Sequence, residues 1–553
     1  MNAVNTLLTL HDPDTARRYY ESGVWRADTF YTLAAGHAAR SPHRPAVRDA
    51  SRRIGYGELV TWADALAEDL HRSGVRRGMR ISIWLANCVE AVAILLACSR
   101  NGYVCNTSLH QQYTVADILR LLERMRTAAL FVQPGYGARS QGVVLESALA
   151  GVESLRKIYS FETPVDECGP RPGFPALIPA TTEADCSADK VMYLAFTSGT
   201  TGDPKGVMHS DNTLLANARA MVEDWRHGPH TVLYSLSPLS HHIGTVAVAQ
   251  ALVAGAELVV NDLTGGATAL QRIVETGATY VMGVPTHAMD ILAEQRKRKL
   301  DRLGEVRVFY MAGAPIPPEV ARAFQRQGIV PQNIYGMTEN SSHQYTLPDD
   351  DAQTIVNTCG RACRAYEVRT FDADNADRPA PPGQVGEIGG RGGCLMLGYF
   401  DNQAATEQSF NATGWFMSGD LGLLDERGCL RVMGRKKDLI IRGGHNIYPA
   451  EIEALAVNHP HVDKAAAIPV PDTRLGEKVC LAVTKAGSTP PGPDEVLPFL
   501  AREGLSKYDM PEYFIVMPEL PLTASGKILK RRLIEMLRNG EIEPLPVRWQ
   551  APA

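Results

Sequence analysis

The pattern of apolar and polar positions divides the chain into three stretches. Between about residues 30 and 310, short apolar runs such as RISIWLA alternate with amphipathic segments of helical period. In the segment GELVTWADALAEDLHRSG, one helical face contains Leu59, Ala63, Leu66 and Leu70. This alternation predicts α/β layers, with the functional residues in the loops at the strand ends.

The pattern changes twice in the second half of the chain. Helical periodicity fades between about residues 355 and 433, where glycine and proline turns separate short runs and predict a β-rich subdomain. After GRKKD, helical segments such as YPAEIEALAVNHP, with Pro449 in the first turn, alternate with strand-like runs such as KVCLAVTKA. The fold class predicted is therefore α/β: a large N-terminal domain over 1–436 and a small α+β C-terminal domain over 437–553.

Composition narrows the class of protein. The 553 residues carry a formal charge of −5, with 45% hydrophobic and 21% charged residues, which is typical of a globular protein. The chain contains no block of basic residues, so nucleic acid is not expected as a partner. The apolar run 91–98 is far shorter than the roughly 20 residues that span a bilayer, and the N-terminus has no basic region typical of a signal peptide. We therefore expect a cytoplasmic protein with no stable membrane insertion.

The ten cysteines do not indicate a metal site. They are scattered along the chain, and only Cys359 and Cys363 lie close together. One C-x₃-C pair without a second pair of ligands is weak evidence for zinc. The sequence therefore favours reduced cysteines that mostly serve packing.

A loop rich in glycine and threonine, TSGTTGDPKG at residues 197–206, has the composition of an anion site. Glycines allow backbone N–H groups to turn inward, hydroxyls can donate, and Lys205 supplies charge. The flanking pattern predicts a strand on both sides, with the next helix starting only at about Asn212. A P-loop or Rossmann loop opens directly into a helix, so neither applies. A flexible surface hairpin remains the alternative for the loop taken alone.

Five further motifs follow the loop: AGAP at 312–315, YGMTE at 335–339, WFMSGD at 415–420, GRKKD at 434–438 and PLTASGK at 521–527. In this order, the six motifs closely resemble those of the adenylate-forming (AMP-binding) superfamily. That superfamily includes acyl- and aryl-CoA ligases, nonribosomal-peptide adenylation domains and beetle luciferases. The segment GRKKDLIIRGGHNIYPAEIE most resembles the corresponding segment of bacterial medium-chain fatty acid or cyclohexanecarboxylate-type CoA ligases.

The resemblance implies a reaction with two halves. A carboxylate attacks the α-phosphorus of ATP, giving acyl-AMP and pyrophosphate, and the thiol of coenzyme A then expels AMP. ATP, Mg²⁺ and coenzyme A are the implied cofactors, and a small-molecule carboxylic acid is the implied substrate. Both halves need charge stabilisation more than a protein nucleophile.

The resemblance also implies roles for individual residues. Lys527, Thr338 and Lys205 are the implied catalytic residues, and Glu339 is the implied magnesium ligand. Tyr335 would stack on adenine, although a buried core aromatic is its commoner fate. The implied nucleotide-binding residues are Thr197, Ser198, Gly199, Thr200, Thr201, Gly202, Lys205, Gly313, Ala314, Pro315, Tyr335, Gly336, Met337, Thr338, Asp420, Arg435 and Lys527.

Three further regions have implied roles in the second half-reaction and in substrate choice. Lys437 stands at the family's hinge, so the resemblance implies a mobile C-terminal domain that exchanges two poses. Gly443 and Gly444 would let the pantetheine arm of CoA pass close to the backbone, and a simple β-turn is compatible with this role. The implied acyl pocket contains His241, His242 and Gly336.

The identity of the acid and of the acceptor stays open at this point. No acidic residue is a clear partner for an amino-acid ammonium, so we expect a hydrophobic medium-chain or ring-containing monocarboxylate, with CoA as the acceptor. No carrier-protein domain is expected after Ala553. One alternative is a free-standing adenylating enzyme that loads a carrier protein. The others are a luciferase-like oxygenase and a nucleotide-binding regulator without catalysis. The oligomeric state, a homodimer among the options, is also open.

Overall fold

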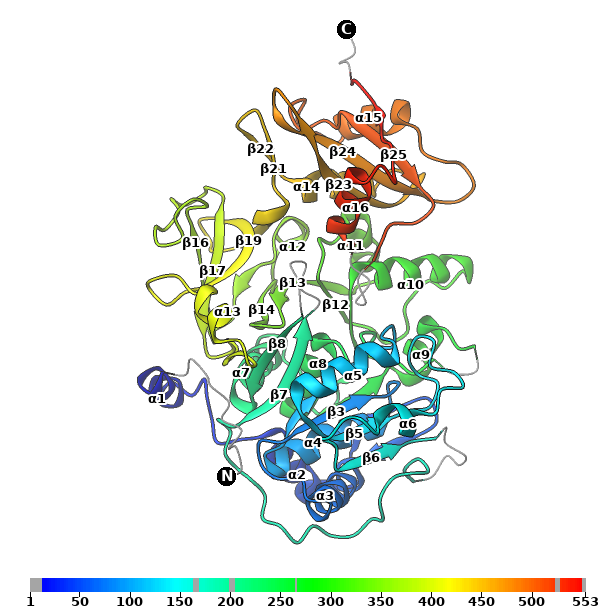
Figure 1. The fold of residues 1–553 in the computed structure, drawn as a ribbon, viewed down its shortest axis with the longest axis vertical. Coiled ribbons are helices and arrows are strands. Elements are labelled where there is room, and N and C mark those ends of the chain that lie inside the picture. Colours follow the sequence, from blue (N-terminus) through cyan, green and yellow to red (C-terminus); the bar gives the residue numbers. More distant parts are fainter. Residues whose placement is uncertain (1–11, 163–168, 198–203, 264–265, 523–527, 550–553) are drawn as a thin grey trace. The chain divides into compact units, whose positions relative to one another are not determined.

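The computed structural model describes residues 12–162, 169–197, 204–263, 266–522 and 528–549 (Figure 1). The chain forms two compact units. The first comprises residues 1–197, 203–367 and 391–408, and the second comprises 198–202, 368–390 and 409–553. The predicted boundary near Lys437 lies inside the second unit and stays a prediction.

The first unit contains two extended sheets. Within the described residues, one has the strand order β15-β14-β13-β12-β11-β9-β10-β1-β2. The pairings from β13 through β12, β11, β9 and β10 to β1 are parallel, as the alternation of strands and helices predicts. The strands are β1 (Pro45–Arg48), β2 (Arg53–Gly55), β9 (Val232–Ser235), β10 (Glu257–Val260), β11 (Tyr280–Gly283), β12 (Val308–Ala312), β13 (Val330–Met337), β14 (Ser341–Tyr345) and β15 (Arg361–Ala362).

The other sheet of this unit has the order β18-β8-β7-β4-β3-β5-β6 among the described residues. Its β7 and β8 are antiparallel neighbours, and β18 joins β8 from far along the chain. The strands are β3 (Arg80–Trp84), β4 (Val104–Asn106), β5 (Thr127–Val132), β6 (Lys157–Ser160), β7 (Val191–Thr197), β8 (Lys205–Ser210) and β18 (Gly398–Tyr399).

Helices connect and cover these sheets. Helix α4 packs against β4 of one sheet and β1 of the other, and α7 likewise contacts both sheets, so these two helices lie between them. The apolar run 91–98 falls inside α4 and is buried there. The helices are α1 (Pro13–Glu21), α2 (Phe30–Arg40), α3 (Tyr56–Arg72), α4 (Val89–Asn101), α5 (Val115–Met125), α6 (Leu145–Leu149), α7 (Asp211–Asp224), α8 (His242–Ala254), α9 (Ala269–Thr276), α10 (Pro285–Lys297), α11 (Pro318–Gln325), α12 (Ala352–Asn357) and α13 (Gln403–Gln408).

The second unit contains a small sheet of order β16-β17-β19-β20 and a larger one of order β22-β21-β24-β25-β26, in which β23 also pairs with β24. The strands are β16 (Tyr366–Phe371), β17 (Gly386–Gly392), β19 (Phe416–Leu424), β20 (Leu430–Arg435), β21 (Ile440–Arg442), β22 (His445–Ile447), β23 (Val462–Asp472), β24 (Gly476–Lys485), β25 (Tyr513–Met517) and β26 (Leu545–Pro546). The helices are α14 (Pro449–Ala456), α15 (Pro493–Arg502) and α16 (Lys530–Arg538), with a 3₁₀ turn at Lys436–Asp438.

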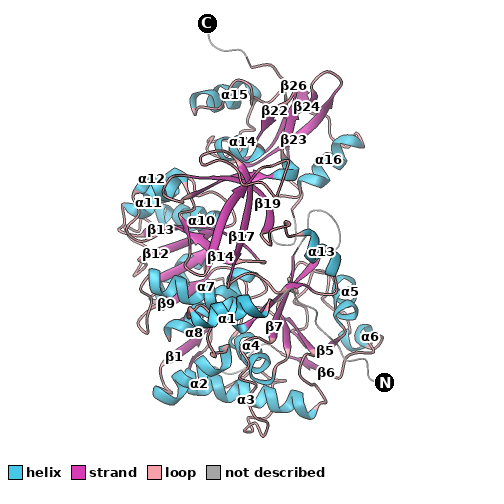
Figure 2. Ribbon diagram, turned by 90° about the vertical axis from the view of Figure 1, so that its left-hand side faces the viewer, coloured by secondary structure: helices cyan, strands magenta, loops and turns pink. Residues whose placement is uncertain are grey.

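Strand β23 shows why this larger sheet is covered on both faces. Ala465 and Ala467 pack with residues of α14 and α15, whereas Ala466 and Ile468 pack with Leu533 of α16. Because successive side chains of a strand point to opposite faces, a run that is apolar at every position needs a helix on each side. Figure 2 shows α14 and α15 on one side of β23 and α16 on the other. The α/β fold class predicted from the sequence is confirmed.

Within the described part of the chain, no helix is both long enough and apolar enough to span a membrane.

Candidate active site

The glycine-rich loop connects two antiparallel strands. β7 ends at Thr197 and β8 begins at Lys205, and these two residues form the last pair of the ladder. The first helix after the loop, α7, begins only at Asp211. The strand-to-strand setting predicted from the sequence is therefore correct. The loop residues Ser198, Gly199, Thr200, Thr201 and Gly202 lie outside the described residues.

Lys205 and Glu339 are joined through an aromatic ring. The Lys205 ammonium lies 4.6 Å from the centre of the Tyr399 ring. The Tyr399 hydroxyl donates to Oε1 of Glu339 at 3.0 Å. Tyr399 reaches this place because β18 pairs with β8, which sets it opposite Val207. The predicted phosphate-binding lysine and the predicted magnesium ligand thus lie on either side of one phenol.

The predicted adenine-binding residues lie at the carboxyl ends of neighbouring parallel strands. Ala312 of β12 pairs with Ile334 of β13, so the exposed segment 313–315 and Tyr335 lie at the same edge of the sheet. Ligands of open α/β sheets bind at this edge. Tyr335 is 9% exposed, and its ring packs edge-on against His343 with 5.5 Å between ring centres. The geometry brings together the two segments that the motif assigns to adenine.

A tight hairpin between β13 and β14 presents Thr338 and Glu339. A Cβ atom added to Gly336 would stand 1.8 Å from the backbone oxygen of Ser341, so only glycine fits there. Ser341 itself has a positive φ of 56°, and the Met337 N–H donates to Oδ1 of Asn340 at 3.0 Å. The close approach of Gly336 to Ser341 and the hydrogen bond from Met337 to Asn340 therefore fix the loop that carries Thr338 and Glu339.

His209 supports this loop from β8. Its Nε2 donates to the backbone oxygen of Thr338 at 2.7 Å, and its Nδ1 lies 3.0 Å from the Thr213 hydroxyl. Burial lowers the pKa of His209 to about 4, because the imidazolium would lose its hydration. The ring is therefore neutral at physiological pH, with its proton on Nε2.

The two predicted acyl-pocket histidines have different neighbours. His242 is partly buried, its ring stacks on His209 with 5.5 Å between ring centres, and its Nε2 lies 2.9 Å from the Ser341 hydroxyl. Burial holds the pKa of His242 well below its usual value. The His241 ring instead lies 4.7 Å from the ring of His110. His242 therefore borders the hairpin, whereas His241 belongs to a second environment.

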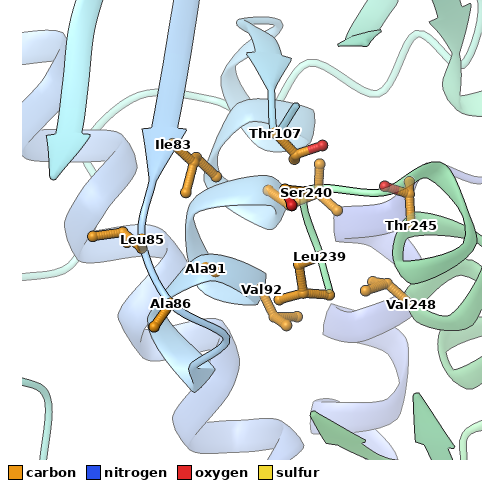
Figure 3. Close-up of a pocket in the computed structure, with 11 residues that line it drawn as sticks. Ile83, Leu85, Ala86, Ala91, Val92, Thr107, Leu239, Ser240, Thr245 and Val248 are labelled. Carbon is orange, nitrogen blue, oxygen red and sulfur yellow. The ribbon is translucent and has the colours of Figure 1, made fainter. Parts of the chain in front are cut away.

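That second environment adjoins a small apolar pocket. His110 places Nδ1 3.1 Å from the hydroxyl of Ser240, and Ser240 lines the pocket. Figure 3 shows side chains from the end of β3, from α4 and from the start of α8 converging there. The volume open to the centre of a water molecule is about 10 Å³, room for a single water. The lining residues are Ile83, Leu85, Ala86, Ala91, Val92, Leu95, Thr107, Leu239, Ser240, Thr245 and Val248, none of which is charged.

In the second unit, Asp420 and Arg435 are cross-strand partners. β19 and β20 pair them directly, and Nε of Arg435 lies 3.5 Å from Oδ1 of Asp420. The Asp420 side chain is 13% exposed and that of Arg435 is 44% exposed. A carboxylate and a guanidinium placed side by side can accept from and donate to a pair of ribose hydroxyls.

Lys437 and the predicted CoA path follow in the chain. Lys437 lies in the 3₁₀ turn after β20, where partial burial and then the charge of Arg435 lower its pKa. Arg442 and His445 pair across a two-residue turn formed by Gly443 and Gly444, whose φ angles are 58° and 86°. Two positive φ values define a type I′ hairpin. The turn is exposed, and its conformation requires residues that tolerate positive φ.

Lys527, the predicted lysine of adenylation, lies outside the described residues. On either side of it, Leu522 and Ile528 form an isolated antiparallel bridge, and α16 begins at Lys530. The Lys530 ammonium pairs with Glu453 at 2.6 Å, where burial raises the pKa of that carboxyl. Lys530 is thus anchored to α14 and is not part of a freely solvated basic face.

Sequence reasoning missed three residues that organise the first unit's part of the site. His209, Tyr399 and His110 belong to no motif quoted from the sequence, and each acts on a residue far along the chain. His209 contacts Thr338 across 129 positions, and Tyr399 contacts Glu339 across 60. No spacing rule connects residues so distant, so only the sheet pairing reveals them. Among the described residues, no group of three or more His, Cys, Asp or Glu side chains could hold a metal by itself.

Comparison with known proteins gives one consistent result. The family described as AMP-binding enzyme matches residues 35–400, and the AMP-binding enzyme C-terminal domain matches residues 451–527. The chain is 32% identical to the medium-chain fatty-acid–CoA ligase of Escherichia coli (strain K12) over 93% of this chain and 91% of that protein. It is 31% identical to the sulfoacetate–CoA ligase of Cupriavidus necator over 92% of this chain and 97% of that one. Among solved structures, ATP-bound MatB from Rhodopseudomonas palustris has a TM-score of 0.80 and 28% identity, covering 92% and 99%.

The close approach at Gly336 predicts a position-specific cost. We expect Gly336→Ala to lower the free energy of unfolding by about 1–3 kcal/mol, because the β13–β14 hairpin must open to admit the methyl group. Urea unfolding would measure the loss. Gly151→Ala is the matched control, since a Cβ there meets nothing within 4 Å. Equal stability of the Gly336 and Gly151 variants would contradict the prediction.

Burial of His209 predicts a pH dependence of stability. Its folded pKa of about 4 lies below the unfolded value of about 6.5, so its contribution is complete above pH 6.5 and falls as the pH drops towards 4. We expect His209→Gln to remove up to about 1.4 kcal/mol per pH unit from the slope in this window. Unfolding free energies measured from pH 4.5 to 7 would show it. The exposed His230→Gln should leave the slope unchanged, and an unchanged slope in His209→Gln would refute the assignment.

Proposed function

Because the chain belongs to the family of AMP-binding enzymes and is an AMP-forming acyl-CoA ligase, we propose that its acid is a hydrophobic medium-chain or ring-containing monocarboxylate. The enzyme activates this acid as acyl-AMP and then transfers it to coenzyme A. The single observation that carries the choice of acid is the uncharged, largely apolar lining of the pocket beside His241, which has room for one water and has to widen to admit an acyl chain. Binding in such a site favours a tail without charge.

The first half-reaction uses groups at the sheet edge of the first unit. Tyr335 and the 313–315 segment hold adenine, Thr338 donates to the α-phosphate, and Lys205 meets the departing phosphates. Glu339 fits Mg²⁺, because a carboxylate oxygen is a ligand that this hard cation prefers and ATP phosphates supply others. The metal would neutralise charge on the phosphates. His209 takes no proton in this scheme, since its neutral ring serves to hold the Thr338 backbone.

The second unit supplies the remaining groups. Asp420 and Arg435 hold the ribose hydroxyls, and Lys527 bridges the attacking carboxylate and the α-phosphate. Lys437 acts as the hinge that changes the pose of the C-terminal domain between the two half-reactions. The turn at Gly443 and Gly444 borders the path of CoA. A cytoplasmic location and a homodimer stay predictions, as does the domain boundary at Lys437.

The alternative acceptor is a carrier protein with a phosphopantetheine arm. It would need the same adenylation residues, so Lys205, Glu339 and Asp420 do not distinguish the two. The match to CoA ligases over more than nine-tenths of the chain favours CoA. A regulator without catalysis is disfavoured, because the sequence retains every residue assigned to adenylation.

A panel of acids tests the substrate class. Each buried CH₂ is worth about 0.8 kcal/mol, or roughly fourfold in binding, so kcat/KM should rise from acetate to hexanoate or cyclohexanecarboxylate and fall once the site is full. CoA-dependent AMP release would be measured for each acid. If the His241 ring limits the site, His241→Ala should shift the optimum towards bulkier acids.

The same panel contains its controls. Amino acids and sulfoacetate should be poor substrates, since a second charged group would be buried without a partner. His230→Ala should leave the optimum where it is. A preference for an amino acid or a charged acid would refute the proposal, and so would an optimum unmoved by His241→Ala. AMP release without CoA ester, but with an acylated carrier protein, would favour the alternative acceptor.

The glycine turn offers a test of the CoA path. Gly444 has a φ of 86°, and a Cβ there meets nothing within 4 Å, so a side chain strains the backbone but does not clash with the protein. We expect Gly444→Leu to lower thioester formation by at least about tenfold and to preserve ATP–pyrophosphate exchange. Gly444→Asn is the control for backbone strain, because Asn tolerates positive φ. Loss of exchange in both variants would assign the turn to folding instead.

A further inference from the structure

A second pocket lies at the C-terminal ends of α7 and α8, in the first unit. Its volume open to the centre of a water molecule is about 460 Å³, and its wall is polar. Four guanidinium groups line it, with one imidazole and one carboxylate: Arg26, Arg219, Arg226, Arg364, His227 and Glu223. None of these residues belongs to the motifs assigned to adenylation or to CoA.

The charges of this pocket do not cancel. Glu223 pairs with Arg364, and Asp28 accepts from Nη2 of Arg219 at 3.2 Å. Two carboxylates against four guanidinium groups leave an excess of two positive charges. The helix dipole stabilises arginines near the C-terminal end of α7, but that interaction is worth less than about 1 kcal/mol at a surface. It does not explain a concave arrangement of four.

One arginine that lines the pocket has a buried donor for which the described residues provide no partner. Arg219 is 6% exposed, and within the described residues its Nη1 makes no hydrogen bond. Nε2 of His227 is also buried there without a hydrogen-bond partner in the described part of the chain. A buried donor left unpaired costs about 1–3 kcal/mol, more when the group is charged. Such a cost is removed when a ligand supplies the acceptor.

The pocket is separate from the site of adenylation. Helix α7 begins beside His209 and runs 14 residues to Asp224, a length of about 21 Å. Arg226 and His227 lie beyond its far end. An anion in this pocket therefore does not compete with ATP for the Thr338 and Lys205 region.

We propose that this pocket binds an oxyanion of the phosphate class, held by Arg219, Arg26 and Arg226. A guanidinium presents paired donors that match the oxygens of a phosphate, and Nη1 of Arg219 provides a buried one. The excess of two charges matches a phosphate dianion better than a monocarboxylate. Free phosphate and the phosphate group of a nucleotide share this chemistry.

Calorimetric titration of the full-length enzyme tests the site. The probes are inorganic phosphate, adenosine 3′,5′-bisphosphate and malonate at constant ionic strength. We expect phosphate to bind the wild type, and the double variant Arg26→Gln/Arg226→Gln to raise its Kd roughly tenfold or more, because two charge-assisted contacts are lost. Arg219→Gln should weaken binding further. If Arg219→Gln fails to fold, the double variant at the exposed rim still decides the question.

Two control variants separate this pocket from other sites. Arg296→Gln removes an exposed arginine elsewhere on the unit and should leave the phosphate Kd unchanged. Lys205→Ala weakens the proposed phosphate contact of adenylation and should also leave it unchanged. Tighter binding of adenosine 3′,5′-bisphosphate than of inorganic phosphate would identify a nucleotide as the source. Absence of phosphate binding, stronger binding of malonate, or binding lost in Lys205→Ala but kept in the double variant would overturn the proposal.

Discussion

The contact between Gly336 and the backbone oxygen of Ser341 is the constraint on which the first unit's part of the site depends. It closes the β13–β14 hairpin so tightly that no side chain fits at position 336. Thr338 and Glu339 then lie in a fixed loop, which His209 holds from β8 and Tyr399 holds from β18. Strands from both sheets therefore meet at one loop. A side chain is held in a defined position when its supporting contacts come from several rigid elements, as the roles proposed for Thr338 and Glu339 require.

Neutral imidazoles make this support possible at the centre of the unit. His209 and His242 stack on each other; His209 is buried and His242 partly so, and desolvation lowers the pKa of both. Two imidazolium ions at that distance would repel each other without water to screen them. As neutral rings they offer one donor and one acceptor each, which suits the Thr338 carbonyl and the Ser341 hydroxyl. The arrangement is stable only above the pH at which such rings become protonated.

The sequence predicts the fold class, the family and most elements, because these depend on local periodicity and on short motifs. The helix after the glycine loop and the strands on either side of that loop are examples that the structure confirms. His209, Tyr399 and His110 could not be found in this way, since their roles come from sheet pairing between distant segments. The acid is equally hidden, because relatives of similar identity act on a medium-chain fatty acid and on sulfoacetate. The residues that choose it line a pocket and form no motif.

The two proposed anion sites use different chemistry, and the difference fits what each must do. The glycine loop carries one lysine, Lys205, whose ammonium lies on the Tyr399 ring. In the proposed reaction, this lysine meets pyrophosphate, an anion that has to leave in every turnover before the thiol reacts. The pocket beyond α7 contains four arginines and a buried unpaired donor among the described residues. Such a set binds an anion through several charge-assisted hydrogen bonds. Its occupant takes no part in the proposed reaction, and its charge offsets the mutual repulsion of the arginines around the end of α7.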